Sequence, residues 1–274
     1  MLFSEACKPN KQPIAQELAS ADAAGLFGAV AADYARHRPT YPPAFFAAFQ
    51  ARLQPAAGAT AVVWDCGCGS GQASLALANR GVQVIATDAS AAQLAAAAAH
   101  PLIDYRQAPA QSSGLAEHSV DGVLVAAAVH WFAGEAFNTE VRRVCRPGAA
   151  MAWIGYLPLQ LPQAALQQRL DHFVAVTLDP WWPPERRWVD RAYAGLPFPG
   201  VEWPFPQQLW IERRWTLQQL LGYVGTWSAV QAARLAGHTL LPDLAAALDA
   251  HWPGSATTPL LVRWPFMGRW GTVT

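Results

Sequence analysis

The sequence is poor in charge, in cysteine and in long apolar runs. Only 14% of its 274 residues are charged, and the formal net charge is zero. A neutral chain has little electrostatic attraction for nucleic acid or anionic membranes, so we expect neither as a partner. No run of about 18 apolar residues is present to span a bilayer, and residues 1–10 lack the basic and apolar segments of a signal peptide. These absences predict a cytoplasmic protein.

Cysteine is scarce, whereas tryptophan is abundant. The four cysteines are Cys7, Cys66, Cys68 and Cys145; the middle two are too close together to cross-link distant segments, and no ligand cluster favours zinc. We therefore expect reduced thiols and no metal. Ten of the 13 tryptophans lie at or after Trp181, which indicates that the C-terminal part is built differently from the rest.

Apolar strand-like segments alternate with alanine-rich helical segments, a pattern typical of βαβ units and a parallel sheet. Expected strands lie near residues 60–65, 82–88, 102–107, 119–127 and 149–156, with two more at 209–215 and 260–270. Expected helices lie near 43–53, 71–80, 90–99, 134–144, 163–177, 216–235 and 242–250. The sequence thus predicts an α/β protein with a Rossmann-like, seven-stranded, mostly parallel sheet and helices on both faces.

The domain organisation follows from the same pattern. Residues 1–22 lack apolar periodicity and are predicted to be a loose arm, and residues 23–274 to be one domain. Within it we expect a ligand-binding core at 43–157, an inserted helical cap rich in tryptophan and proline at about 158–205, and C-terminal helices and strands at 206–274. Pro265 predicts that the last strand is an edge strand or a bulged one.

The core is organised around residues 62–71, which run from an apolar strand through glycines at every second position into a helix. Such a turn binds nucleotide-like ligands in α/β proteins. The dinucleotide fingerprint fails here, because its third glycine would fall on Gln72 or Ser74. Asp65 would also face a pyrophosphate, at a cost of about 4 kcal/mol for like charges ~4 Å apart at an effective dielectric near 20. The turn therefore favours a cationic ligand such as S-adenosylmethionine.

The motifs extend this interpretation to a family. Residues 65–71 match the Asp/Glu-x-Gly-x-Gly-x-Gly motif of the class I S-adenosylmethionine-dependent methyltransferases, and the chain resembles their type 11 group. Residues 87–90, 108–111, 119–125 and 144–149 resemble the family's later motifs, with Gln111 where an acid is commoner. Segments 27–42, 128–132 and 222–228 are similar to a subgroup related to trans-aconitate methyltransferase.

The resemblance, together with the charge argument, implies roles for particular residues. Asp65 would meet the methionine ammonium, Asp88 the ribose hydroxyls, and Ala110 and Gln111 the adenine. The predicted cofactor-binding residues are Tyr34, Arg38, Asp65, Gly67, Cys68, Gly69, Gly71, Asp88, Ala89, Ala110, Gln111 and Ala126. The predicted substrate-binding residues are His130, Trp131, Tyr156, Tyr223 and Trp227. We expect the glycines to let the backbone approach the ligand.

His130 follows the fourth expected strand and is the candidate catalytic residue. It would act as a base on a hydroxyl acceptor, whereas a carboxylate needs no base; a purely structural histidine is the alternative. Residues 126–129 lack the Asn/Asp-Pro-Pro-Tyr/Phe motif of amino-methyltransferases. We therefore predict methyl transfer to an oxygen of a small molecule, by a monomer or homodimer. The alternatives are an S-adenosylmethionine-binding protein without turnover and a nicotinamide-dependent oxidoreductase.

Overall fold

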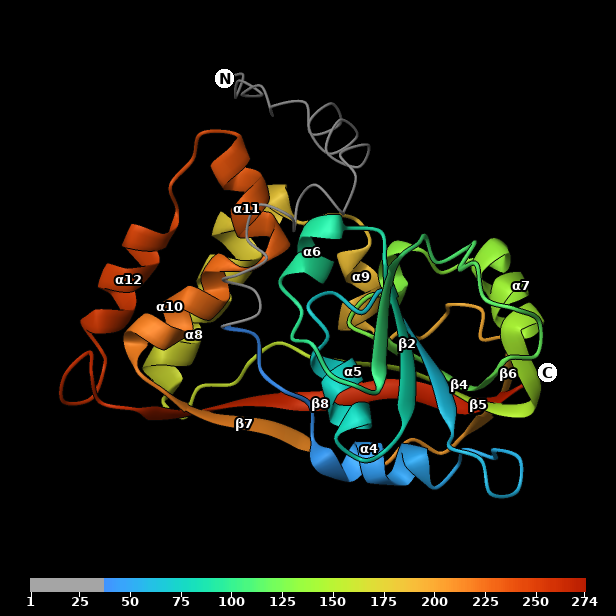
Figure 1. The fold of residues 1–274 in the computed structure, drawn as a ribbon. Helices are drawn as coiled ribbons and strands as arrows, with labels where there is room; N and C mark the ends of the chain where they lie inside the picture. Colours follow the sequence, from blue (N-terminus) through green and yellow to red (C-terminus); the bar gives the residue numbers. More distant parts are fainter. Residues whose placement is uncertain (1–36) are drawn as a thin grey trace, which may run out of the picture.

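The computed structural model describes residues 37–274, whose centre is an eight-stranded sheet with helices on both faces (Figure 1). The strands are β1 Val62–Cys66, β2 Gln83–Asp88, β3 Ile103–Gln107, β4 Val120–Ala126, β5 Cys145–Tyr156, β6 Gly200–Trp203, β7 Trp210–Trp215 and β8 Leu260–Val273. The helices are α4 Pro43–Gln50, α5 Gln72–Ala78, α6 Ala91–Ala95, α7 Glu135–Val144, α8 Ala164–His172, α9 Arg186–Asp190, α10 Leu217–Gly225, α11 Ser228–Leu235 and α12 Leu241–Asp249. Short segments η1 Val129–Trp131, η2 Phe173–Thr177 and η3 Asp179–Trp181 complete the described chain. The α/β prediction is confirmed, but the strand count of seven is wrong because it omits β6.

The sheet has the order β3-β2-β1-β4-β5-β8-β6, and β7 pairs with β8. Strands β1 to β5 are parallel, whereas β8 runs antiparallel to β5, β6 and β7. The carboxyl ends of the parallel strands therefore meet at one edge of the sheet, which is where such folds bind ligands.

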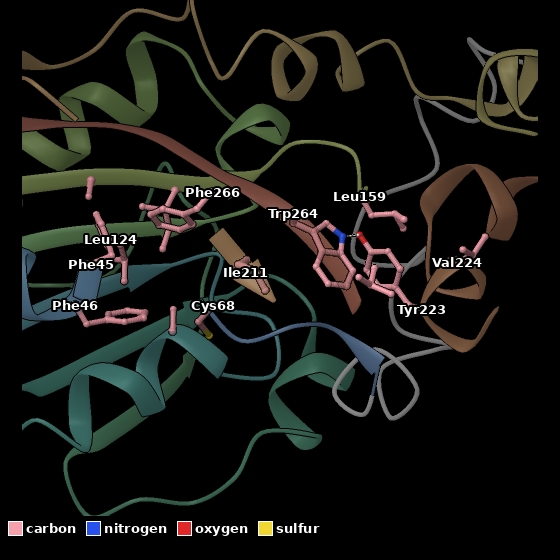
Figure 2. Packing of buried hydrophobic residues seen from close by; sticks show 14 of the residues in the cluster. Phe45, Phe46, Cys68, Leu124, Leu159, Ile211, Tyr223, Val224, Trp264 and Phe266 are labelled. Atoms are coloured by element: carbon pink, nitrogen blue, oxygen red, sulfur yellow. Dashed lines mark hydrogen bonds between the residues drawn. The ribbon is translucent and has the colours of Figure 1, made fainter. Parts of the chain in front are cut away.

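Successive residues of the central strands point to opposite faces, so the sheet has a core on each side. On β4, Leu124 packs with the α4 phenylalanines, including Phe45, whereas Val123 and Val125 pack with Phe137 of α7 on the other face. All five side chains are fully buried. Figure 2 shows Phe45 and Leu124 close together, with the same apolar cluster continuing along β8.

Strand β8 corrects the prediction made from Pro265. The strand is paired on both sides: β5 lies along one edge, and β6 and β7 share the other. Pro265 is tolerated because pairing with β7 ends at this residue and pairing with β5 begins one residue later, at Phe266. Its carbonyl still accepts a hydrogen bond from Leu157 N at 3.0 Å. The missing N–H falls where the partner strands change.

Helices α8, α10, α11 and α12 gather at one end of the sheet, where β7 and the first half of β8 extend (Figure 1). Helix α12 packs on both α8 and α10, and α11 packs on η3. This helical layer thus draws on the predicted cap and on the C-terminal segment. The single helix expected at 216–235 is two helices, because the chain turns at Thr226, whose hydroxyl donates to Tyr223 O at 2.6 Å. No helix within residues 37–274 is long and apolar enough to cross a membrane.

Candidate active site

A cavity of about 350 Å³ opens at the carboxyl ends of the parallel strands. Loops after β1, β2, β3 and β4 form most of its wall. The predicted cofactor residues that line it are Arg38, Gly67, Cys68, Gly69, Asp88, Ala89, Ala110, Gln111 and Ala126. Asp65 and Gly71 lie outside the lining, and Tyr34 lies outside the described residues. Nine of the residues predicted to bind a cofactor therefore line one cavity.

Two glycines of the first loop are required by the packing of the protein itself. Gly67 and Gly71 have φ values of +68° and +82°, which side chains rarely adopt. A Cβ at Gly67 would lie 2.7 Å from the Cβ of Ala128, and one at Gly71 would collide with the Tyr105 side chain. Neighbouring protein atoms leave no room for a side chain at these two positions, so the loop is held by close packing; the expected approach of the backbone to the ligand stays a prediction.

Asp88 ties the two strand ends together at the cavity wall. Its Oδ2 accepts from Gly69 N and its Oδ1 from Ser90 N, both at 2.8 Å. Burial is the main cause that raises the pKa of this carboxyl, while the two backbone donors oppose it. Ser90 in turn caps α6 by accepting from Gln93 N. The carboxylate is fixed in place, and its remaining lone pairs can accept from hydroxyl groups.

Asp65 lies behind the glycine loop at the end of β1 and is fully buried. Ser74 Oγ donates to Oδ2 at 2.5 Å, whereas Oδ1 is buried without a hydrogen-bond partner among residues 37–274. Burial raises the pKa of Asp65 to about 7, and the charge of Asp88 adds to the rise. A positive charge bound nearby would reverse this penalty.

These groups fit S-adenosylmethionine. Gln72 Nε2, on the cavity wall, is a buried donor without a described partner, and Asp65 Oδ1 is a buried acceptor without one. An amino-acid moiety offers a carboxylate to the first and an ammonium to the second, and Asp88 suits a ribose. Residues 37–274 contain no group of three or more His, Cys, Asp or Glu side chains placed to hold a metal ion.

A second cavity of about 120 Å³ adjoins the first. The two share Arg38, Ala127, Trp131 and Tyr156 as lining residues. The predicted substrate residues His130, Trp131, Tyr156, Tyr223 and Trp227 all line the second cavity. The prediction missed Leu159, Val174, Trp182, Arg186, Val189 and Tyr193, which also line it. The density of tryptophan and proline around residue 182 was visible in the sequence, but nothing in it indicated that this segment returns to β4.

Arg38 lies on the wall between the two cavities. Its Nη1 donates to Tyr156 Oη at 2.7 Å, and its Nε donates to Thr226 Oγ1 at 3.0 Å. The guanidinium carbon is 5.5 Å from the ring centroid of Tyr223, and Tyr223 Oη accepts from Trp264 Nε1 at 3.1 Å (Figure 2). Arg38 thus links the end of β5 to the turn between α10 and α11.

His130 lies in η1, directly after β4. Its ring stacks on that of Tyr193, with centroids 6.3 Å apart and planes 14° apart, and contacts Trp131. Nδ1 is buried without a described hydrogen-bond partner. Burial, followed by the charges of Arg186 and Arg38, lowers the pKa of His130 to about 3. The imidazole is therefore neutral and a weak base.

The chain is similar to known methyltransferases over most of its length. A model of the methyltransferase domain matches residues 64–153. A solved structure from Anaeromyxobacter dehalogenans, assigned as a type II methyltransferase, is 41% identical with a TM-score of 0.74, covering 86% of this chain and 97% of that one. A protein of Dictyostelium discoideum assigned as a methyltransferase is 28% identical over 80% of this chain and 82% of its own length. An uncharacterized methyltransferase of Mycobacterium tuberculosis is 36% identical over a segment that covers 47% of this chain and 51% of that protein.

The glycine loop, the acid that ends β2 and the adjoining cavity on a mostly parallel sheet are the features of a nucleoside-binding α/β enzyme. With these relatives, the chain belongs to the class I S-adenosylmethionine-dependent methyltransferases, and its cofactor is S-adenosylmethionine. The nicotinamide alternative is thereby set aside. The narrower similarity to trans-aconitate methyltransferase stays a prediction.

Proposed function

We propose that the protein methylates an oxygen of a small carboxylic acid. The observation that carries the proposal is the second cavity. It adjoins the cofactor cavity, and aromatic rings, two guanidinium groups and a neutral imidazole form much of its wall. No aspartate or glutamate is among its described lining residues. Such a wall favours an anion with an apolar body over a cation or a bare polar molecule.

The state of His130 favours a carboxylate over a hydroxyl. A general base works best when its pKa lies near the operating pH. A histidine whose pKa is lowered to about 3 accepts a proton from an alcohol poorly. A carboxylate is already ionised, so its methylation requires positioning and exclusion of water rather than proton removal. In this proposal His130 forms a hydrogen bond with the molecule that is methylated, instead of serving as the predicted base.

The proposed roles follow from the shared wall. When bound, S-adenosylmethionine supplies a methyl carbon whose bond to positively charged sulfur breaks as the bond to the acceptor oxygen forms. Trp131, Tyr156 and Arg38 line both cavities and would hold the reacting carboxylate beside that carbon. Arg38 would offer positive charge, and the rings would exclude water. The cavity is smaller than the roughly 300–1,000 Å³ typical of drug-sized ligands, which favours a small acceptor.

The proposal is tested with methyl-labelled S-adenosylmethionine and acceptors matched in carbon skeleton: phenylacetate, 2-phenylethanol and phenylacetamide, and the corresponding set built on hexanoate. We expect label in the acids, released as methanol by mild alkali as from a methyl ester. Alkali-stable label in the alcohol or amide would overturn the choice of acceptor. Binding of S-adenosylhomocysteine without methylation of any acceptor would favour the binding protein without turnover.

A further inference from the structure

The loop between β3 and β4, residues 108–119, forms the part of the cofactor cavity where adenine is predicted to bind. Ala108, Pro109, Ala110 and Gln111 of this loop line the cavity. Strands of a parallel sheet are usually joined through a helix, whereas residues 108–119 contain none. The backbone of this loop therefore depends on hydrogen-bond partners that other elements supply.

The start of the loop is held by the end of β2. Ala108 N donates to the carbonyl of Asp88 at 3.1 Å. Ser112 N donates to the carbonyl of Pro109 at 3.1 Å, which closes a turn over residues 109–112. Asp88 is also the residue predicted to meet the ribose. One end of the turn is therefore fixed relative to the predicted ribose position.

The other end of the turn is held by Glu140 of α7. Glu140 Oε1 accepts from Ser113 N at 2.8 Å and from Ser113 Oγ at 2.5 Å. Ser113 Oγ in turn accepts from Leu115 N at 3.2 Å. Glu140 and Ser113 are both buried, and neither lines the cavity. The Glu140 carboxylate thus holds the turn from behind the cavity wall.

Arg143, one helical turn further along α7, orients this carboxylate. Its Nε donates to Glu140 Oε2 at 2.7 Å and its Nη2 to Oε1 at 2.8 Å, which makes the pair bidentate. The same Nη2 donates to the carbonyl of Leu115 at 2.8 Å. The hydrogen bond from Arg143 is the main cause that lowers the pKa of Glu140 to about 2; burial opposes it, and the Ser113 donors add to it. Glu140 is therefore ionised at neutral pH, and a charged acceptor binds the loop more strongly than a neutral one.

A turn that is fixed at both ends can distinguish one purine base from another. The edge of adenine presents a hydrogen-bond acceptor at N1 and an amino donor at C6, whereas hypoxanthine presents a donor at N1 and an acceptor oxygen at C6. A wall that cannot move leaves the wrong base with unpaired groups, which costs binding free energy. A wall that can move adjusts to either base and loses the distinction.

We infer that Glu140 is a positioning residue for the cofactor: by anchoring Ser113, it fixes the turn over residues 109–112 against the base and gives the enzyme its selectivity for adenine. Adenine is taken at its predicted place beside Ala110 and Gln111. The methyl acceptor plays no part in this role, so the proposed function can fail without affecting it.

The test is isothermal titration with S-adenosylhomocysteine and with S-inosylhomocysteine, which differs from it only in the base. For the wild type we expect the Kd of S-inosylhomocysteine to be higher by at least about tenfold. Glu140→Gln removes the charge that holds Ser113 and Arg143. In this variant S-adenosylhomocysteine should bind about tenfold more weakly, whereas the Kd of S-inosylhomocysteine should stay within about threefold of its wild-type value. Ser113→Ala, which keeps the backbone N–H, should reduce the selectivity about threefold.

The matched control is Glu135→Gln at the first residue of the same helix, where the carboxylate is exposed and accepts from Arg142 Nη1 at 3.0 Å. It should leave both Kd values within about twofold, because an exposed ion pair contributes little. The ratio of the two Kd values decides, since a merely structural role of Glu140 would weaken both ligands by the same factor. Such an equal loss, an unchanged ratio in Glu140→Gln, or a wild type that binds both ligands equally would overturn the inference. If Glu140→Gln does not fold, Ser113→Ala decides by the same ratio.

Discussion

The two adjoining cavities are built by opposite means. The cofactor cavity consists mainly of backbone and small side chains from loops after β1 to β4, within residues 67–128. The second cavity, where we propose that the acceptor binds, consists mainly of large side chains from segments as far apart as Arg38 and Trp227. In the proposed function, the loops after the parallel strands bind the cofactor, and the large side chains of the second cavity select the acceptor. Changes in the first cavity should therefore affect donor binding, and changes in the second should affect acceptor choice.

The largest expected effect is the loss of cofactor affinity when Asp88 is replaced. Asp88→Ala removes the acceptor of two backbone hydrogen bonds, from Gly69 and Ser90, and with it the proposed ribose contact. We expect the Kd of S-adenosylhomocysteine, measured by isothermal titration, to rise at least about 100-fold, which corresponds to about 2.7 kcal/mol.

The control for this variant is Asp104→Ala on the neighbouring strand β3, where the carboxylate is exposed and Arg106 is its one partner within the described part of the chain. The affinity of Asp104→Ala for S-adenosylhomocysteine should stay within about twofold of the wild-type value, because exposed ion pairs contribute little to stability. Tryptophan fluorescence of the cap should be the same in both variants. A Kd for Asp88→Ala within threefold of wild type would contradict the placement of the ribose.

The next effect concerns how the glycine loop is held. Gly71 and Gly81 both have φ of +82°, but only Gly71 has protein atoms, those of Tyr105, where a Cβ would lie. Gly81→Ala should lower the free energy of unfolding by about 1 kcal/mol, from backbone strain alone. Gly71→Ala should cost about 2 kcal/mol or more, because overpacking adds to the strain. Urea denaturation of both variants measures the difference, and equal losses would show that the packing against Tyr105 is unimportant.

The sequence identified many of the residues that line the first cavity because the determinants of that cavity are local. The alternation of strands and helices and the spacing from Asp65 to Gly71 each lie within a few residues, so pattern and charge could be interpreted directly. The parallel strands then bring their ends together by topology alone, which placed Asp88 beside Gly69.

The lining of the second cavity could be predicted only in part, because its contacts are long-range. His130 and Tyr223 were identified through family resemblance, whereas Arg186 was missed because its place in the lining depends on α9 packing against η1. The strand β6 was missed because four residues between prolines show no periodicity, and only pairing with β8 makes them a strand. The same long-range pairing overrode the expectation from Pro265.

The smallest effect sharpens the comparison, because it asks whether cofactor binding also depends on the buried charge of Asp65, behind the cavity lining. Asp65 is buried, with its pKa raised to about 7. The free enzyme therefore retains a proton on Asp65 at pH 5.5 and loses it as the pH rises through about 7. A bound ammonium favours the ionised form, so the affinity for S-adenosylhomocysteine should rise about tenfold between pH 5.5 and 7.5. Calorimetric titrations across this range measure the rise.

In Asp65→Asn the affinity should be lower and independent of pH, since the amide carries no charge. The unliganded wild type should also lose stability as the pH rises from about 4 to about 7, because the unfolded chain releases the Asp65 proton at lower pH than the folded chain does. The asparagine variant should lack this loss, which thermal unfolding at pH 5 and pH 7.5 would reveal. An affinity for S-adenosylhomocysteine that varies with pH equally in both proteins would place the charge that meets the ammonium elsewhere.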